Sequence, residues 1–254
     1  MKSFIRSSVI LGLVGSSVLI SSLLDSSLNV LALTPKQIVE KLNQIPVFTI
    51  GNSNEILLST EDDRRAFVTY LSHQDAQQVV KEITKENPET KVEVITIPLG
   101  QVYELLKNKE KSQSQEPPDL FTFVPLKAQL KSALSILREE DPNIESFPGI
   151  PLFYGMVKVD KQDTFLSVQD GKESFTPFYF ERESLQKLIE NIRLKQPEFA
   201  SSIKVKVTPL GGIVSAFESD DKKKEDFVKS VILVPSQESA KKVLETSKQN
   251  QQAK

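Results

Sequence analysis

Apolar positions along the chain follow two spacings, one typical of helices and one typical of strands. Residues 73–86 carry apolar side chains at i, i+3, i+4 and i+7, which predicts a helix that Ser72 caps and that ends before Pro88. Similar patterns predict helices over residues 99–107 and 129–139. Alternating or β-branched stretches predict strands over 46–50, 55–59, 66–71, 92–97 and 120–125. Strands mixed with short helices indicate an α+β fold.

The same order of elements recurs about 110 residues further along the chain. Ile-Pro-Val-Phe at 45–48 recurs as Ile-Pro-Leu-Phe at 150–153. Eight of the 14 prolines match in this way, and a matched proline marks a matched backbone position because its ring fixes φ. The pairs are Pro46 with Pro151, Pro88 with Pro197, Pro98 with Pro209 and Pro125 with Pro235. The pattern favours an internal duplication over a chance similarity of two generic β/α stretches.

The duplication predicts two similar halves, each made of a β-sheet and helices. The first half covers residues 33–140 and the second covers residues 150–246, joined by a linker at 141–149. The polar residues 247–254 are predicted to be a disordered tail. We expect the two halves to pack about a pseudo-twofold axis and to leave apolar grooves beside their sheets.

The first 32 residues have the pattern of a secretory signal peptide. Lys2 and Arg6 supply a basic start, residues 7–24 are uncharged and largely apolar, and Val-Leu-Ala at 30–32 resembles a cleavage site. This pattern predicts export and cleavage after Ala32. An uncleaved membrane anchor is an alternative, although six serines weaken such a span. A plastid transit peptide is a further alternative, but the apolar stretch is too continuous for the typical amphipathic form.

Composition removes most of the usual catalytic chemistry. The chain has no cysteine and one histidine, which excludes a disulfide, a thiolate nucleophile, a Cys-ligated metal and any site with two imidazoles. Its 32 basic and 34 acidic residues nearly cancel, and this balance argues against nucleic-acid binding. His73 beside Ser72 is the one seed for a Ser-based hydrolase, but neighbouring helix residues do not face each other. We therefore predict no enzymatic activity, no cofactor and no metal site.

Phenylalanine is unusually frequent, with 14 Phe against four Tyr and no Trp. Alternation along a strand places Phe178 and Phe180 on one face and Tyr179 on the other. Most of these rings are expected in the core, and some are expected to line an apolar groove that holds a polypeptide. The candidate client or partner contacts are Phe48, Phe121, Phe123, Phe153, Phe178 and Phe180.

Several short motifs occur in an order that resembles a known family. They are Leu-Asn-Gln-Ile-Pro-Val-Phe at 42–48, the helix start at 72–77, Asn-Pro-Glu at 87–89, Pro-Leu at 98–99, Phe-Val-Pro at 123–125, Gly-Ile-Pro-Leu-Phe at 149–153 and Val-Pro at 234–235. Together they resemble the Tic-twenty-two (Tic22) family, the soluble intermembrane-space component of chloroplast protein import, which has cyanobacterial periplasmic relatives. The resemblance covers about residues 36–246, and the lysine-rich residues 107–111 depart from the compact pattern of the family.

The resemblance implies a duplicated α+β fold with apolar grooves and a chaperone-like role in protein transport and outer-membrane biogenesis. The implied partners are unfolded or transiting polypeptides and an outer-membrane barrel assembly or translocon protein, and peripheral membrane association stays open. The resemblance supplies no catalytic motif. The bacterial-style signal peptide favours a cyanobacterial periplasm, with the plastid intermembrane space as the alternative location. A periplasmic hydrolase with a Ser-based site and an envelope scaffold without client specificity remain alternative functions.

Overall fold

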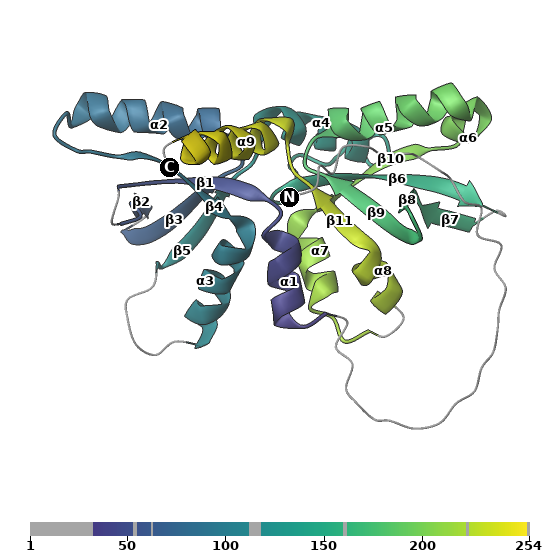
Figure 1. The fold of residues 1–254 in the computed structure, drawn as a ribbon, viewed down its shortest axis with the longest axis horizontal. Coiled ribbons are helices and arrows are strands. Elements are labelled where there is room, and N and C mark those ends of the chain that lie inside the picture. The colour runs from purple at the N-terminus through teal and green to yellow at the C-terminus, as the bar shows by residue number, and fades with distance from the viewer. Residues whose placement is uncertain are drawn as a thin grey trace.

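The computed structural model describes residues 33–52, 55–61, 63–111, 118–159, 162–221 and 224–252. The predicted signal peptide, residues 1–32, lies outside the described residues. The described chain forms two mixed β-sheets that lie side by side, with helices on both faces (Figure 1). This arrangement confirms the predicted α+β class.

The first sheet is formed by residues before the linker and the second by residues after it. The first contains β1 (Pro46–Gly51), β2 (Ser59–Glu61), β3 (Arg64–Tyr70), β4 (Glu93–Pro98) and β5 (Leu120–Val124). The second contains β6 (Pro151–Val159), β7 (Gln162–Phe165), β8 (Val168–Asp170), β9 (Glu173–Tyr179), β10 (Lys204–Pro209) and β11 (Val231–Val234).

The two sheets share one pairing scheme. In the first, β4, β1 and β3 pair antiparallel in that order, and β5 pairs parallel with β3. In the second, β10, β6 and β9 pair antiparallel in that order, and β11 pairs parallel with β9. The registers also correspond, because Pro46 lies opposite Pro98 and Pro151 lies opposite Pro209. Pro46 and Pro98 therefore occupy the same places in the first sheet as Pro151 and Pro209 do in the second.

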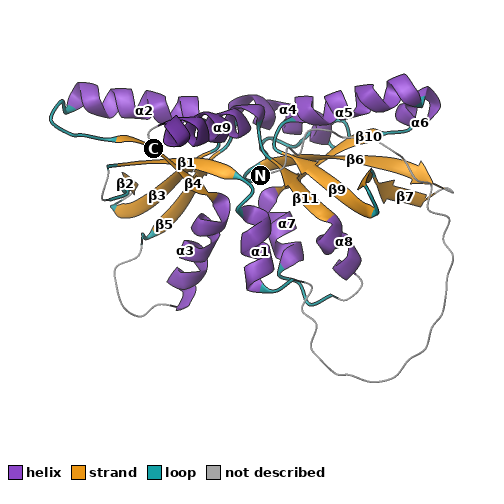
Figure 2. Cartoon of the chain, viewed as in Figure 1, coloured by secondary structure: helices purple, strands orange, loops and turns teal. Residues whose placement is uncertain are grey.

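Helices cover both faces of the sheets (Figure 2). One face carries α2 (His73–Glu86), α4 (Lys127–Arg138), α5 (Arg182–Lys195), α6 (Pro197–Ser201) and α9 (Gln237–Gln252). The other face carries α1 (Pro35–Leu42), α3 (Leu99–Lys111), α7 (Leu210–Phe217) and α8 (Glu225–Ser230). Among the described residues, no helix is both long enough and apolar enough to cross a bilayer.

The last helix of each half lies over the sheet of the other half. α4 follows the first sheet in sequence but packs on β6 and β10, whereas α9 follows the second sheet but packs on β1 and α2. α4 and α9 each also carry a side chain that accepts a hydrogen bond from a backbone N–H in the first turn of the long helix beside it, where the helix itself offers no partner. The Gln129 side-chain oxygen on α4 accepts the Arg182 N–H at 3.0 Å, and a Glu238 carboxylate oxygen on α9 accepts the Gln74 N–H at 2.9 Å. Residues on either side of the linker at 141–149 therefore pack against one another, because each sheet is covered in part by a helix from the other side of the linker.

The hydrophobic core has two parts. One joins both halves and includes Val47 and Phe67 from the first sheet with Leu152 and Phe178 from the second. The other lies under α4 and α5 and includes Phe153 and Tyr179 of the second sheet. Because α4 contributes Ala133 and Ile136 to this second part, burial of the second sheet depends on residues of the first half.

Several elements differ from the prediction. Residues 55–59 were expected to form one strand, but Ile56 makes an isolated bridge to Gly51 and β2 begins only at Ser59. Helices α1, α6 and α8 were not predicted. α9 is helical through Gln252, whereas residues 247–254 were expected to be disordered; no glycine or proline follows Pro235 to end the helix.

Candidate functional site: two surface grooves

Four of the six phenylalanines predicted as client contacts are core residues. Phe48 and Phe153 are 0% exposed, and Phe178 and Phe180 are 1% and 2% exposed. A ring with no accessible surface cannot touch a partner, so this part of the prediction is wrong. The alternation along the strand was read correctly, but both faces of the strand are covered. Phe178 and Phe180 pack in the shared core, and Tyr179 packs under α5.

Phe121 and Phe123 differ from the other four, because both are half-buried on β5. They pack against the shared core, and the Phe121 ring lies 5.5 Å from the ring of Phe67. In the second sheet, Val231 and Leu233 on β11 are 0% and 7% exposed. α8 leads directly into β11 and packs on β9, which contributes to this difference. Phe121 and Phe123 therefore remain candidates for contact with a partner.

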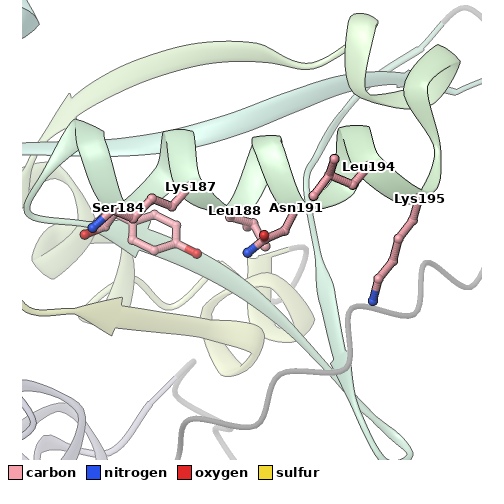
Figure 3. A pocket seen from close by; sticks show the side chains of 7 residues that line it. Ser184, Lys187, Leu188, Asn191, Leu194 and Lys195 are labelled. Carbon is pink, nitrogen blue, oxygen red and sulfur yellow. The ribbon is translucent and has the colours of Figure 1, made fainter.

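A groove runs along α5 on the outer helical layer (Figure 3). It has a volume of about 440 Å³ and is open to solvent on one side. Tyr179 of β9 lies at its base and is 9% exposed, while Leu194 on the rim is 86% exposed. The other lining residues are Ser184, Lys187, Leu188, Asn191 and Lys195, all on α5. Sequence analysis did not identify this groove, although Leu188 and Leu194 extend the apolar surface of α5 beyond its core-facing residues.

The charged groups in the α5 groove are both cationic. Lys187 and Lys195 belong to its lining, and no aspartate or glutamate does. Neither lysine forms an ion pair with a carboxylate in the described part of the chain, and Lys187 donates a hydrogen bond to the Gln237 side-chain oxygen at 3.1 Å. Burial raises the pKa of Tyr179 to about 12, so the phenol stays neutral at physiological pH. The groove thus combines an apolar base with a positive rim.

A second groove lies on the opposite face, between α1 and α3. It has a volume of about 610 Å³ and is lined by Val39 and Tyr103 together with charges of both signs. The Tyr103 hydroxyl donates to a Glu218 carboxylate oxygen at 2.8 Å, and the Lys107 ammonium lies 3.0 Å from the same oxygen. These contacts tie α3 to the end of α7. Its lining thus carries charges of both signs, whereas the charged side chains that line the α5 groove are all cationic.

The Ser72 and His73 pair is used for structure. The Ser72 hydroxyl oxygen accepts the Asp75 N–H at 3.1 Å, which confirms the predicted helix cap. The His73 ring instead packs edge-on against Phe48 at 5.2 Å. Burial is the largest cause that lowers the pKa of His73, followed by the Lys242 charge. In the described part of the chain, no group of three His, Asp or Glu side chains is placed to hold a metal ion.

The fold and the site together define an α+β protein with two adjoining sheets and a solvent-open groove on each helical face. The chain belongs to the Tic22-like family, whose family model matches residues 16–245. This match confirms the resemblance inferred from the motifs.

Two solved structures have a similar fold. One is Tic22 of Anabaena, a protein-transport protein, which is 24% identical in sequence and has a TM-score of 0.65. The match covers 83% of this chain and 96% of the Anabaena chain. Tic22 from Plasmodium falciparum is also 24% identical, with a TM-score of 0.61, over 81% of this chain and 95% of that one. No curated protein sequence matches the chain.

Proposed function

We propose that this protein is a chaperone-like factor that assists protein transport and outer-membrane biogenesis by binding polypeptides on its apolar surfaces. Its place of action is the periplasm, or the equivalent space between two envelope membranes. Membership of the Tic22-like family and the signal-peptide pattern of residues 1–32 support this proposal. The protein-transport description of Anabaena Tic22, which has a similar fold, agrees with it.

The exposed Leu194 at the rim of the α5 groove is the observation that carries the proposal. A leucine that is 86% exposed beside a partly apolar groove leaves apolar surface available for an unfolded chain. Leu188 and Tyr179 extend this surface toward the base of the groove. On the other face, the half-buried Phe121 and Phe123 are the remaining candidate contacts from the six predicted phenylalanines.

An aggregation assay tests the proposal. A urea-denatured outer-membrane β-barrel protein is diluted into buffer with and without this protein, and light scattering is followed. We expect the wild-type protein to suppress scattering and the Leu188→Ser/Leu194→Ser variant to suppress it much less. The matched control is Leu105→Ser, since Leu105 is 37% exposed on α3 at the opposite face. A wild-type protein that neither suppresses scattering nor co-purifies with the denatured protein would contradict the proposed function.

We also propose that the two halves are copies of one ancestral unit. The shared pairing scheme and the corresponding registers of Pro46–Pro98 and Pro151–Pro209 support this. Backbone superposition of residues 46–138 on residues 151–245, with the loops left out, tests the idea. Strands that fail to superpose in the order β1, β3, β4, β5 on β6, β9, β10, β11 would contradict it.

A further inference from the structure

Helix α5 has two rows of side chains with different surroundings. The core-facing row contains Leu185, Ile189 and Ile192, which are 0%, 8% and 1% exposed. The second row, Ser184, Leu188, Asn191 and Lys195, has the spacing i, i+4, i+7, i+11 and lines the groove. This spacing is that of one face of a helix, and eleven residues advance the axis by about 16 Å. The groove therefore runs parallel to α5 for about three turns.

The corresponding helix of the first half keeps only part of this apolar surface, because Val79 of α2 stands where Leu188 stands in α5 but no leucine corresponds to Leu194. α2 and α5 both have 14 residues, and the thirteenth and fourteenth are Lys85 and Glu86 in α2 but Leu194 and Lys195 in α5. Leu194 is thus an apolar side chain at a position where the fold accepts a charged one. Because nothing in the described part of the chain buries Leu194, packing among the described residues does not explain its apolar character.

The two lysines of the groove favour a partner segment that carries negative charge. Lys187 lies near the start of the row and Lys195 at its end, so the cations stand at both ends of the apolar surface. With no acidic group in the lining, a partner with carboxylates at matching positions gains two ion pairs, and a basic partner meets two like charges.

We infer that the α5 groove binds an acidic amphipathic helix of a partner polypeptide. Its apolar residues pack against Leu188 and Leu194, and its carboxylates face Lys187 and Lys195. A membrane surface fits less well, because the Tyr179 ring lies at the base of a concave site that a flat bilayer does not reach. This inference rests on the proposed function and specifies which polypeptide segments the protein prefers.

Binding of two designed peptides tests the inference. Both are fluorescein-labelled helical peptides of about 18 residues with leucines at i, i+4, i+7 and i+11, flanked by glutamates in one and by lysines in the other. Fluorescence anisotropy measures their affinity for the full chain without its signal peptide. We expect the Glu peptide to bind at least about tenfold more tightly than the Lys peptide, with a preference that weakens at high salt.

Substitutions locate the site and its charge selectivity. Leu194→Asp should weaken binding of the Glu peptide by at least about tenfold, and Lys187→Glu/Lys195→Glu should reverse the preference toward the Lys peptide. Leu105→Asp and Lys36→Glu, on the opposite face, should change affinity by less than about twofold. Because the chain has no cysteine, Asn191→Cys should form a disulfide by exchange with a Glu peptide whose single cysteine carries a 2-thiopyridyl leaving group, and Asn108→Cys in the α1–α3 groove should react much more slowly.

Three results would overturn the inference. They are equal affinity for the two peptides, binding that survives Leu194→Asp, and binding to phosphatidylglycerol vesicles that depends on Leu194 without any peptide binding. The aggregation assay run on the same samples separates this failure from that of the proposed function. Suppression of aggregation without peptide binding would contradict only the inference that the groove binds acidic helices. Absence of both would contradict the proposed function as well.

Discussion

The ammonium nitrogen of Lys41 on α1 lies 2.7 Å from the backbone carbonyl oxygen of Val231, which is 190 residues away at the start of β11. The same ammonium donates to the carbonyl of Lys229 at 3.0 Å. It also lies 5.9 Å from the centre of the Phe217 ring. Partial burial lowers the pKa of Lys41. Helix α1 is thus tied to β11, and it joins the two halves.

Replacement of Lys41 by Met should destabilise the protein by about 1–3 kcal/mol, because two carbonyls lose a charged donor. Chemical denaturation measures the difference in the free energy of unfolding. Lys36→Met on the same helix is the matched control, since its contact with Glu40 at 3.9 Å is exposed to solvent. Equal stability of the Lys41 variant and the wild type would show that these hydrogen bonds do not hold α1 in place.

Removal of α9 should loosen the first half more than the second. A chain that ends at Ser236 loses the Glu238 contact with the Gln74 N–H and the packing of α9 on β1. Hydrogen exchange should show protection in α2 and β1 reduced by at least about tenfold, with smaller changes in α5 and β6. Leu244→Ser serves as a control, because Leu244 is 60% exposed. A greater loss of protection in the second sheet than in the first would contradict the packing of α9 on β1 and α2.

Core and groove residues should respond differently to truncation. Phe178→Ala should cost about 3–5 kcal/mol, because it leaves a cavity in the core that joins the two halves. Leu194→Ala should change stability by less than about 0.5 kcal/mol, because that side chain is exposed. Thermal and urea denaturation measure both values. A large loss of stability in the Leu194 variant would mean that this residue serves the fold and not a partner.

Tyr179 should make the free energy of unfolding fall at alkaline pH. Burial raises its pKa to about 12 from an ordinary value of 10.0, so the unfolded chain releases the proton first. Its contribution is complete below pH 10 and is lost as the pH rises toward 12, by about 2–3 kcal/mol in all. Unfolding measured from pH 9 to pH 12 should show a shallower decline for Tyr179→Phe. Parallel curves for the two proteins would contradict this effect.

His73 should titrate below 6.5, its ordinary value, because burial and then the Lys242 charge lower its pKa, while Glu238 and Glu245 act in the opposite direction. A lowered pKa in the fold means that the stability contributed by the neutral ring is lost as the pH falls through it. Proton NMR of this single histidine gives the value directly. Lys242→Gln should raise the pKa and Lys241→Gln should not; an unchanged pKa in the Lys242 variant would contradict the assignment.

Prediction from sequence succeeded where neighbouring residues decide the structure. The spacing in residues 73–86 and the Ser72 cap identified α2, because a helix depends on contacts three and four residues apart. α1 could also have been predicted, since Thr34 and Gln37 form a full capping box with Pro35 between them. The extent of α9 could likewise have been inferred from the absence of glycine and proline after Pro235.

Prediction failed where distant residues decide the structure. Alternation correctly separated Phe178 from Tyr179, but it could not show that one ring packs in the shared core and the other under α5. The α5 groove was missed for a related reason. Leu188 belongs to the apolar row of residues 185–192, and only the packing of β9 and α5 shows that it borders a groove. Leu194 lies on the opposite side of the helix from Leu185, so its exposure follows from the spacing, but its place beside a groove does not.

Local pattern was sufficient for most of the strands, the long helices, the repeated prolines and the family of the protein. Three features are visible only in the folded chain. They are the packing of α4 on the second sheet and of α9 on the first, the hydrogen bonds of Lys41 to the start of β11, and which phenylalanines are buried. The physical reason is that periodicity determines which residues share a face. What packs against that face depends on contacts between segments that are distant in sequence, such as Gln129 with Glu183, 54 residues apart, and Lys41 with Val231, 190 residues apart.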